Sequence, residues 1–162
     1  MKKTFIKKLI LASLFMALTI VLTAFVYIPI GSQGGYINLG DSIIVISSIT
    51  LGPVYGMIVG SVGSMIADLI VAPQYAIFTF VIKGIEGLLI GLLYKANKKK
   101  IGIFISSLIG LSFMVIGYYF VGVLMYESFV LPLIDTLFNL IQLVASLLIS
   151  QTIIYSIYRY IK

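Results

Sequence analysis

The run LILASLFMALTIVLTAFVYI, residues 9–28, decides the fold class, because it carries no charged side chain and follows four lysines within the first eight residues. An apolar stretch of about 20 residues is long enough to cross the hydrocarbon core of a bilayer as a helix. A cleaved signal peptide would have a shorter apolar region, of about 7–15 residues, and a small-residue cleavage site. No such site follows, and we therefore expect a retained membrane helix.

The composition of the whole chain leads to the same class of protein. Of the 162 residues, 61% are hydrophobic and 10% are charged, and the mean hydropathy is +1.20. A soluble domain is about 45–50% apolar and about 25% charged, so this chain is not a soluble domain. It has no cysteine, histidine or tryptophan, which excludes disulfides, thiolate nucleophiles, imidazole acid–base chemistry and histidine metal sites.

The apolar runs are separated by segments rich in proline, glycine or lysine, which predict the helix ends. We expect an all-α integral membrane protein with a single domain over residues 1–162. The six expected helices cover about residues 9–28, 41–51, 54–71, 75–94, 101–126 and 129–158, with an outer loop over residues 29–40.

The basic residues predict the orientation. All but Lys83 of the 11 Lys and Arg residues lie at the N-terminus, in residues 95–100 or at the C-terminus. Cytoplasmic loops are enriched in Lys and Arg, and the three groups share one side only if the short 41–51 segment counts as a span. This predicts six spans with both termini cytoplasmic. The topology accounts for the net charge of +6, which therefore does not indicate binding to nucleic acid. Tyrosines at the outer ends (Tyr27, Tyr75, Tyr126) and at the inner ends (Tyr94, Tyr155, Tyr158) suit interfacial belts.

Polar side chains inside the expected helices mark a candidate site. An ionisable group at membrane depth, such as Lys83, costs about 2.5–3.5 kcal/mol and suggests a function. Lys83 can pair with Glu86, and the i, i+4, i+7 spacing places both on one helical face with Thr79. The last helix repeats this pattern with Asp135, Asn139 and Gln142, and Tyr118 and Tyr119 lie at a similar outer depth. Asp41 opens the second helix, where it could also act only as a cap.

These residues predict a polar pocket that opens outward over an apolar floor. The alternative is that they serve only as hydrogen bonds between helices. Asp68 follows a stripe of small residues (Gly52, Gly56, Gly60, Ser64) at steps of four, which predicts a close-packing face and makes Asp68 a weaker candidate. Ser13 and Ala17 form another small pair, either for packing within the bundle or for docking another membrane protein.

The sequence contains no motif for catalysis or ATP hydrolysis. It lacks the Gly-x-x-x-x-Gly-Lys-Ser/Thr loop, and it lacks G-x-S-x-G and H-E-x-x-H elements, which argues against an embedded enzyme. Its halves show no clear inverted repeat of the kind that secondary transporters use. A pocket without these elements predicts a binding subunit that depends on partners.

Four motifs in fixed order resemble a known family. The motifs are GYINLGD (35–41), LGPVYG (51–56), GSVGSMIAD (60–68) and KGIEG (83–87). They resemble the substrate-binding S components of energy-coupling factor (ECF) vitamin transporters, most closely the branch for hydroxymethylpyrimidine, pyridoxine and related precursors. The resemblance implies capture of a vitamin from outside, under a lid formed by the loop between the first two helices. It also implies a transmembrane coupling protein and two cytoplasmic ATPases as partners, in the plasma membrane of a bacterium.

The resemblance also implies roles for residues. Lys83 and Glu86 would bind the hydroxyls and ring nitrogen of the ligand, Asn139 and Gln142 would form the opposite wall, Tyr118 or Tyr119 would stack on its ring, and Tyr36 with Asn38 would close the lid. Ser13 and Ala17 match the Ala-x-x-x-Ala pair by which the family contacts its coupling protein. The candidate ligand-binding residues are Tyr36, Asn38, Asp41, Thr79, Lys83, Glu86, Tyr118, Tyr119, Asp135, Asn139 and Gln142.

We expect no metal site in this chain. We also expect no cofactor, because the partner ATPases would bind and use the ATP. Alternatives remain for the function. The ligand could be another vitamin, such as riboflavin, cobalamin or niacin. The chain could also be a stand-alone proton-coupled transporter in which Lys83, Glu86 or Asp135 relays protons, or a purely structural protein.

Overall fold

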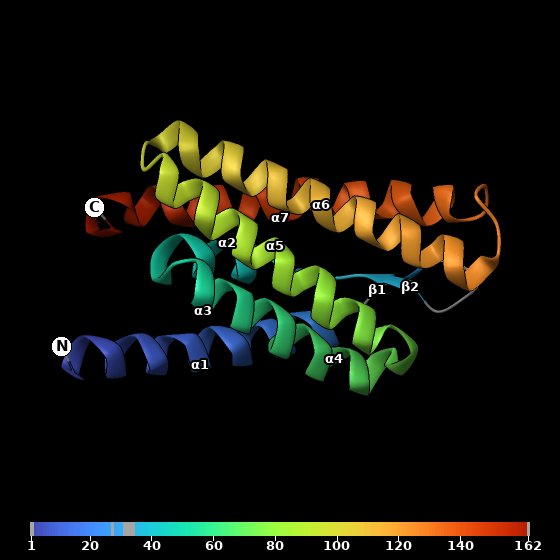
Figure 1. The fold of residues 1–162 in the computed structure, drawn as a ribbon, viewed down its shortest axis with the longest axis horizontal. Helices are drawn as coiled ribbons and strands as arrows, with labels where there is room; N and C mark the ends of the chain where they lie inside the picture. The colour runs from blue at the N-terminus through green and yellow to red at the C-terminus, as the bar shows by residue number, and fades with distance from the viewer. Residues whose placement is uncertain (1, 27, 31–34, 162) are drawn as a thin grey trace.

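The computed structural model describes residues 2–26, 28–30 and 35–161, whose helices lie roughly along one long axis (Figure 1). The elements are α1 (Lys2–Phe25), β1 (Ile28–Ile30), β2 (Gly35–Ile37), α2 (Gly40–Leu51), α3 (Pro53–Ile58), the π-helix η1 (Val59–Gly63), α4 (Ser64–Val71), the 3-10 turn η2 (Pro73–Tyr75), α5 (Ala76–Ala96), α6 (Lys100–Tyr126) and α7 (Pro132–Ile161). Tyr27, expected in an interfacial belt, and residues 31–34 of the expected outer loop lie outside the described residues.

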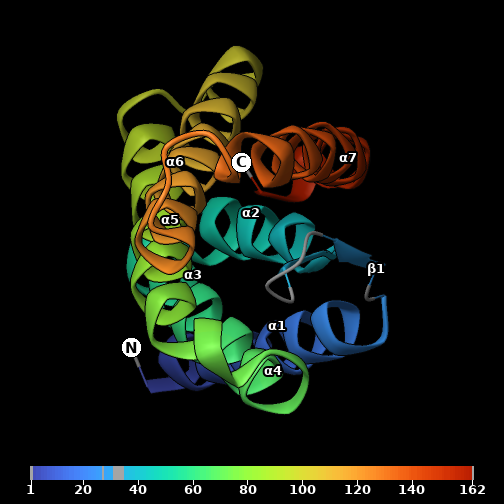
Figure 2. The ribbon, with the colours of Figure 1, turned by 90° about the vertical axis from the view of Figure 1, so that its right-hand side faces the viewer.

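Among the described residues, five helical segments are long and apolar enough to cross a membrane. They are Lys3–Phe25, Pro53–Val71, Pro73–Ala96, Lys100–Tyr126 and Pro132–Tyr158. The remaining predicted span is the second helix, α2, which has 12 residues. At 1.5 Å per residue it is about 18 Å long, shorter than the roughly 30 Å hydrocarbon core. It is buried along almost its whole length and lies between α1 and α7 (Figure 2). The chain is therefore a helical membrane protein, and it remains a prediction that α2 forms one of six spans.

A small hairpin, which the helical periodicity did not predict, begins at the last residue of the expected first helix and continues into the expected outer loop. β1 pairs with β2 in antiparallel register, with Ile28 opposite Ile37. Helix α1 ends at Phe25 rather than near residue 28. Pro29 disfavours helical geometry at Ile28, which pairs with Ile37 in the hairpin instead. Similarly, α7 begins at Pro132 rather than at residue 129, as expected for proline in the first turn of a helix.

The three basic segments share one end of the bundle. The two termini and the turn between α5 and α6 lie at the left of Figure 1, and the hairpin and the α6–α7 turn lie toward the right. We call the left end the basic end and the right end the hairpin end. The six-span topology requires this grouping of lysines. The cytoplasmic location of the basic end remains a prediction.

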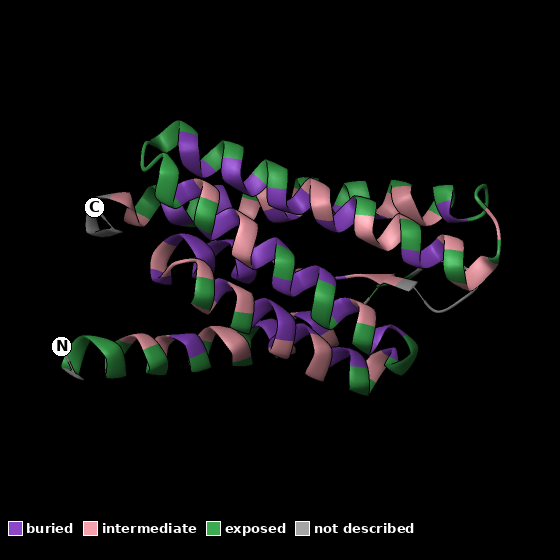
Figure 3. Ribbon diagram, in the orientation of Figure 1, coloured by how far each residue is buried: buried purple, intermediate pink, exposed green. Residues whose placement is uncertain are grey.

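Close backbone contacts hold the centre of the bundle together. A Cβ atom at Gly60 would lie 2.3 Å from the carbonyl oxygen of Lys83, and one at Gly56 would lie 2.8 Å from the Cα atom of Ser48. Close packing of the predicted stripe is thus confirmed at Gly56 and Gly60, which bring α3 and η1 against α2 and α5, whereas a Cβ at Gly52 would meet no atom within 4 Å. Buried residues face the interior and exposed residues the outside (Figure 3). Large exposed apolar side chains, such as Phe25 on α1 and Leu124 on α6, suit contact with lipid.

Candidate ligand site at the hairpin end

A cavity lies at the hairpin end, between β2, α4, η2, α6 and α7. It contains about 500 Å³ of space between atoms, part of it open to the exterior. Its lining combines aromatic rings, amides and carboxylates, the groups that orient a polar heterocycle. The lining residues are Tyr36, Asn38, Asp68, Tyr75, Tyr118, Gly122, Asp135, Asn139 and Gln142.

The hairpin is anchored to the helices beneath it by hydrogen bonds. The hydroxyl of Tyr36 on β2 donates to a carboxylate oxygen of Asp68 on α4. The backbone N–H of Asn38 donates to Oε1 of Gln142 on α7 at 2.8 Å, and its side-chain oxygen accepts from the N–H of Gly40 at 2.8 Å. Burial, together with the Asp68 carboxylate, raises the pKa of Tyr36 well above its ordinary value, so its hydroxyl keeps the proton that it donates.

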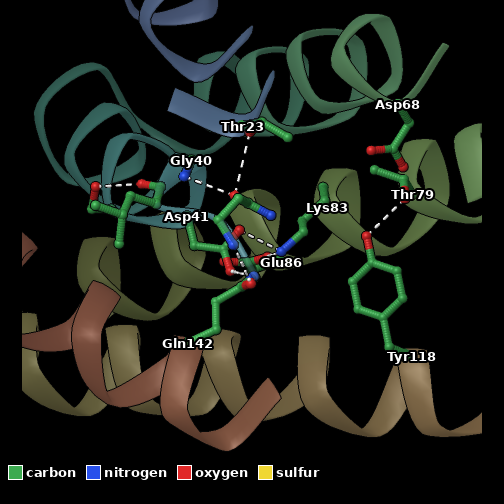
Figure 4. A network of polar contacts seen from close by, with 12 residues as sticks. Thr23, Gly40, Asp41, Asp68, Thr79, Lys83, Glu86, Tyr118 and Gln142 are labelled. Carbon is green, nitrogen blue, oxygen red and sulfur yellow. Dashed lines mark hydrogen bonds and ion pairs between the residues drawn. The ribbon is translucent and has the colours of Figure 1, made fainter. Parts of the chain in front are cut away.

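A buried ion cluster lies deeper between α2 and α5 (Figure 4). The ammonium of Lys83 forms an ion pair with Asp41 and lies 3.5 Å from Oε2 of Glu86. Gln142 donates its amide to the second oxygen of Asp41 at 2.7 Å. Since Lys83 and the two carboxylates are at most 2% exposed, each depends on the others for its charge to be tolerated. Asp41 is therefore a member of this cluster, and α2 shows no side-chain cap hydrogen bond.

Two tyrosines that follow one another on α6 have different surroundings. The hydroxyl of Tyr118 lies 2.7 Å from that of Thr79, and its ring lies 5.4 Å from the Lys83 nitrogen. Tyr119 does not line the cavity, and its hydroxyl donates to the carbonyl oxygen of Phe129 at 3.1 Å. Because consecutive helical residues point about 100° apart, only one of the pair can face the cavity.

The structure brings part of the predicted site together around the cavity. Of the candidates, Tyr36, Asn38, Tyr118, Asp135, Asn139 and Gln142 line it. Asp41, Thr79, Lys83 and Glu86 form the polar contacts described above without lining it. Ligand contact by any of these residues remains a prediction.

Two lining residues, Tyr75 and Gly122, are not among the predicted site residues, and a third, Asp68, is only a weaker candidate from the sequence. In the structure Asp68 is 1% exposed and bonded to the hairpin. The sequence does contain a signal for Asp68 as a site residue, namely a carboxylate at the end of a glycine stripe, because close packing of helices needs no charged side chain. The expected apolar floor is also wrong in part, since Gln151 and Ser107 form a buried hydrogen bond of 3.2 Å nearer the basic end.

The remaining candidates concern metal binding and docking. In the ranges that the structure describes, no three acidic side chains gather closely enough to hold a metal ion. Ser13 and Ala17 are exposed on α1. They are accordingly accessible to a partner, and docking at this pair remains a prediction.

The fold and the cavity together define a class: a small multi-pass membrane protein with a candidate ligand site between its helices at one end. A sequence model of the family described as "ECF-type riboflavin transporter, S component" matches residues 3–159. The chain belongs to this family, whose members are substrate-binding components of transporters rather than enzymes. The family also implies association with an ECF module and a small-molecule substrate.

A curated relative is similar over much of the chain. It is described as "Uncharacterized protein in gap 3'region" from Pyrococcus woesei and is 40% identical over 106 residues, which is 65% of this chain and 72% of the relative. The family match confirms the resemblance to ECF S components. The hydroxymethylpyrimidine and pyridoxine branch remains a prediction.

Proposed function

We propose that this chain captures a small heteroaromatic vitamin or vitamin precursor at the hairpin end for import driven by partner ATPases. The observation that supports this most directly is the cavity, which combines tyrosine rings with amide groups beneath an anchored hairpin. Aromatic rings stack on a flat heterocycle, and amides supply both donors and acceptors to its edge. Family membership supports the division of labour, with a binding subunit here and ATP hydrolysis elsewhere.

For the substrate, we propose first a pyridoxine, pyridoxal or hydroxymethylpyrimidine type of ligand. The motifs in residues 35–91 support this choice through their resemblance to that branch. Riboflavin is the second candidate because the matching family is described by that vitamin. Both are flat heteroaromatic compounds with hydroxyl groups. A titration with each compound distinguishes the two candidates by their affinities.

The test begins with the full chain purified in mild detergent. Mass spectrometry of the small molecules released on denaturation should identify a vitamin at stoichiometric occupancy, and titration with that compound should reproduce binding. Asn139→Ala removes a lining amide and should weaken binding about tenfold or more. Asn97→Ala makes the same change at an exposed site near the basic end and should leave affinity unchanged. An empty preparation that binds no vitamin from a panel would refute the proposal.

The buried ion cluster supports one alternative, a stand-alone proton-coupled transporter. Carboxylates paired with a lysine inside a membrane protein are typical of proton relays, and Glu86 and Asp41 share Lys83 here. Reconstituted vesicles distinguish the two functions. Uptake by this chain alone, driven by a proton gradient, would favour the relay. Uptake that requires the coupling protein and ATP would favour the vitamin-binding subunit.

A further inference from the structure

The lining of the cavity is unbalanced in charge. Two carboxylates line it, those of Asp68 and Asp135, and none of the described lining residues is a lysine or an arginine. The Asp135 carboxylate accepts a hydrogen bond of 2.5 Å from the hydroxyl of Tyr126, which is neutral and leaves the charge in place. An anionic ligand would therefore enter a cavity whose fixed charges repel it.

Lys83 does not correct this imbalance. Its ammonium already forms an ion pair with Asp41 and lies 3.5 Å from Glu86. The cluster thus contains two carboxylates and one ammonium, and it offers no spare positive charge to a ligand. The other lysines and the arginine among the described residues belong to the start of α1, the end of α7 and residues 95–100, at the basic end.

Asp68 combines burial with an unused acceptor. One of its oxygens accepts the Tyr36 hydroxyl, and Thr79 lies beside the carboxylate (Figure 4). Its second oxygen, Oδ2, is buried and has no hydrogen-bond partner among the described residues. Leaving a buried charged acceptor unpaired is costly, so a site of this kind is completed by a donor from outside the chain. Tyr75 and Tyr118 line the same cavity, and their rings favour a flat ligand and attract positive charge.

We propose that Asp68 is the specificity-determining acceptor of the cavity, and that the ligand is an unphosphorylated heterocycle that presents an N–H or cationic nitrogen to it. The inference rests on the proposed function and narrows its substrate class. A phosphate ester carries roughly −1.5 to −2 charge at pH 7, whereas the free vitamin carries none of this charge. The cavity therefore separates the two forms of one vitamin by charge rather than by ring shape.

The experiment compares ligands that differ only by phosphate. The unaltered full chain in detergent is titrated calorimetrically with pyridoxal and pyridoxal 5′-phosphate, with hydroxymethylpyrimidine and its phosphate, and with riboflavin and its 5′-phosphate. In the pair that binds, the free compound should bind at least about tenfold more tightly than its phosphate ester. Equal or tighter binding of the ester would overturn the role of Asp68 and leave the proposed function standing. Binding of no compound in the panel would overturn both.

A charge-matched pair of variants then assigns the selectivity to Asp68. Asp68→Asn keeps the size of the side chain and removes its charge. It should weaken binding of the free vitamin about 10- to 100-fold and reduce the discrimination against the ester. Glu127→Gln removes one carboxylate from the exposed α6–α7 turn at the same end and should change neither quantity. Unchanged discrimination in a folded Asp68→Asn protein would overturn the assignment, and the comparison on the unaltered chain stands even if this variant fails to fold.

Discussion

Replacing Lys83 by methionine tests whether the buried ion cluster holds the bundle together. Lys83 on α5 forms an ion pair with Asp41 on α2 and lies near Glu86 on its own helix. Methionine preserves much of the apolar stem and removes the ammonium. Two carboxylates that are at most 1% exposed would then share one region of the interior without a cation.

The magnitude follows from the geometry. At the 3.5 Å between the Lys83 nitrogen and the Glu86 oxygen, two unit charges attract by about 5 kcal/mol at an effective dielectric constant of about 20, before desolvation is subtracted. Removing one partner of a buried pair costs about 3–5 kcal/mol, because the remaining charge is left uncompensated. At about 2–4 °C per kcal/mol for a chain of this size, the melting midpoint should fall by about 6–20 °C.

Circular dichroism at 222 nm during heating in detergent measures this change, because the fold is helical. Tryptophan fluorescence is not an option, because the sequence contains no tryptophan. Lys95→Met makes the same substitution at an exposed position near the end of α5 and should shift the midpoint little. Combining Lys83→Met with Asp41→Asn and Glu86→Gln removes the unpaired charges and should recover much of the loss. A Lys83→Met protein that melts within about 2 °C of the unaltered chain would refute the reasoning.

Three further variants address packing, docking and the hairpin. Gly60→Ala places a Cβ atom 2.3 Å from the Lys83 carbonyl oxygen, so it should destabilise the fold by about 1–3 kcal/mol in the same melting experiment; an unchanged midpoint would contradict this packing. Ala17→Leu lies on the exposed side of α1 and should reduce co-purification of the coupling protein without changing ligand affinity; normal co-purification would argue against docking there. Gln142→Leu removes the acceptor of the Asn38 N–H and should accelerate hydrogen exchange of that amide, while equal exchange would show that the hairpin is held by other contacts.

The helical architecture could be predicted because long apolar runs and their breaks are local features of the sequence. Pro132 is an example, since it determines where α7 begins. The hairpin could not be predicted in this way, because its strands have three residues each and their pairing depends on packing against the surrounding helices.

The candidate site was predictable to the extent that it follows helical periodicity. Lys83 and Glu86 share a buried face because they are three residues apart. The sequence makes Asp68 only a weaker candidate because its contact with Tyr36 joins residues 32 positions apart, which no local pattern encodes. It predicts Tyr119 together with Tyr118 because adjacent tyrosines lie at the same depth in the helix, and only the structure shows which of them lines the cavity.

Gln142 couples the hairpin to the ion cluster through the two ends of one amide. Its oxygen accepts from the Asn38 N–H, and its nitrogen donates to Asp41. Since an amide cannot turn over without exchanging its donor and acceptor, movement of Gln142 alters both contacts at once. A ligand that keeps the hairpin in place therefore also preserves the environment of Asp41 and Lys83. Lys83 can thus influence ligand affinity without touching the ligand. A Lys83 variant that binds the ligand more weakly therefore identifies Lys83 as a contact residue only if the melting midpoint of the variant is unchanged.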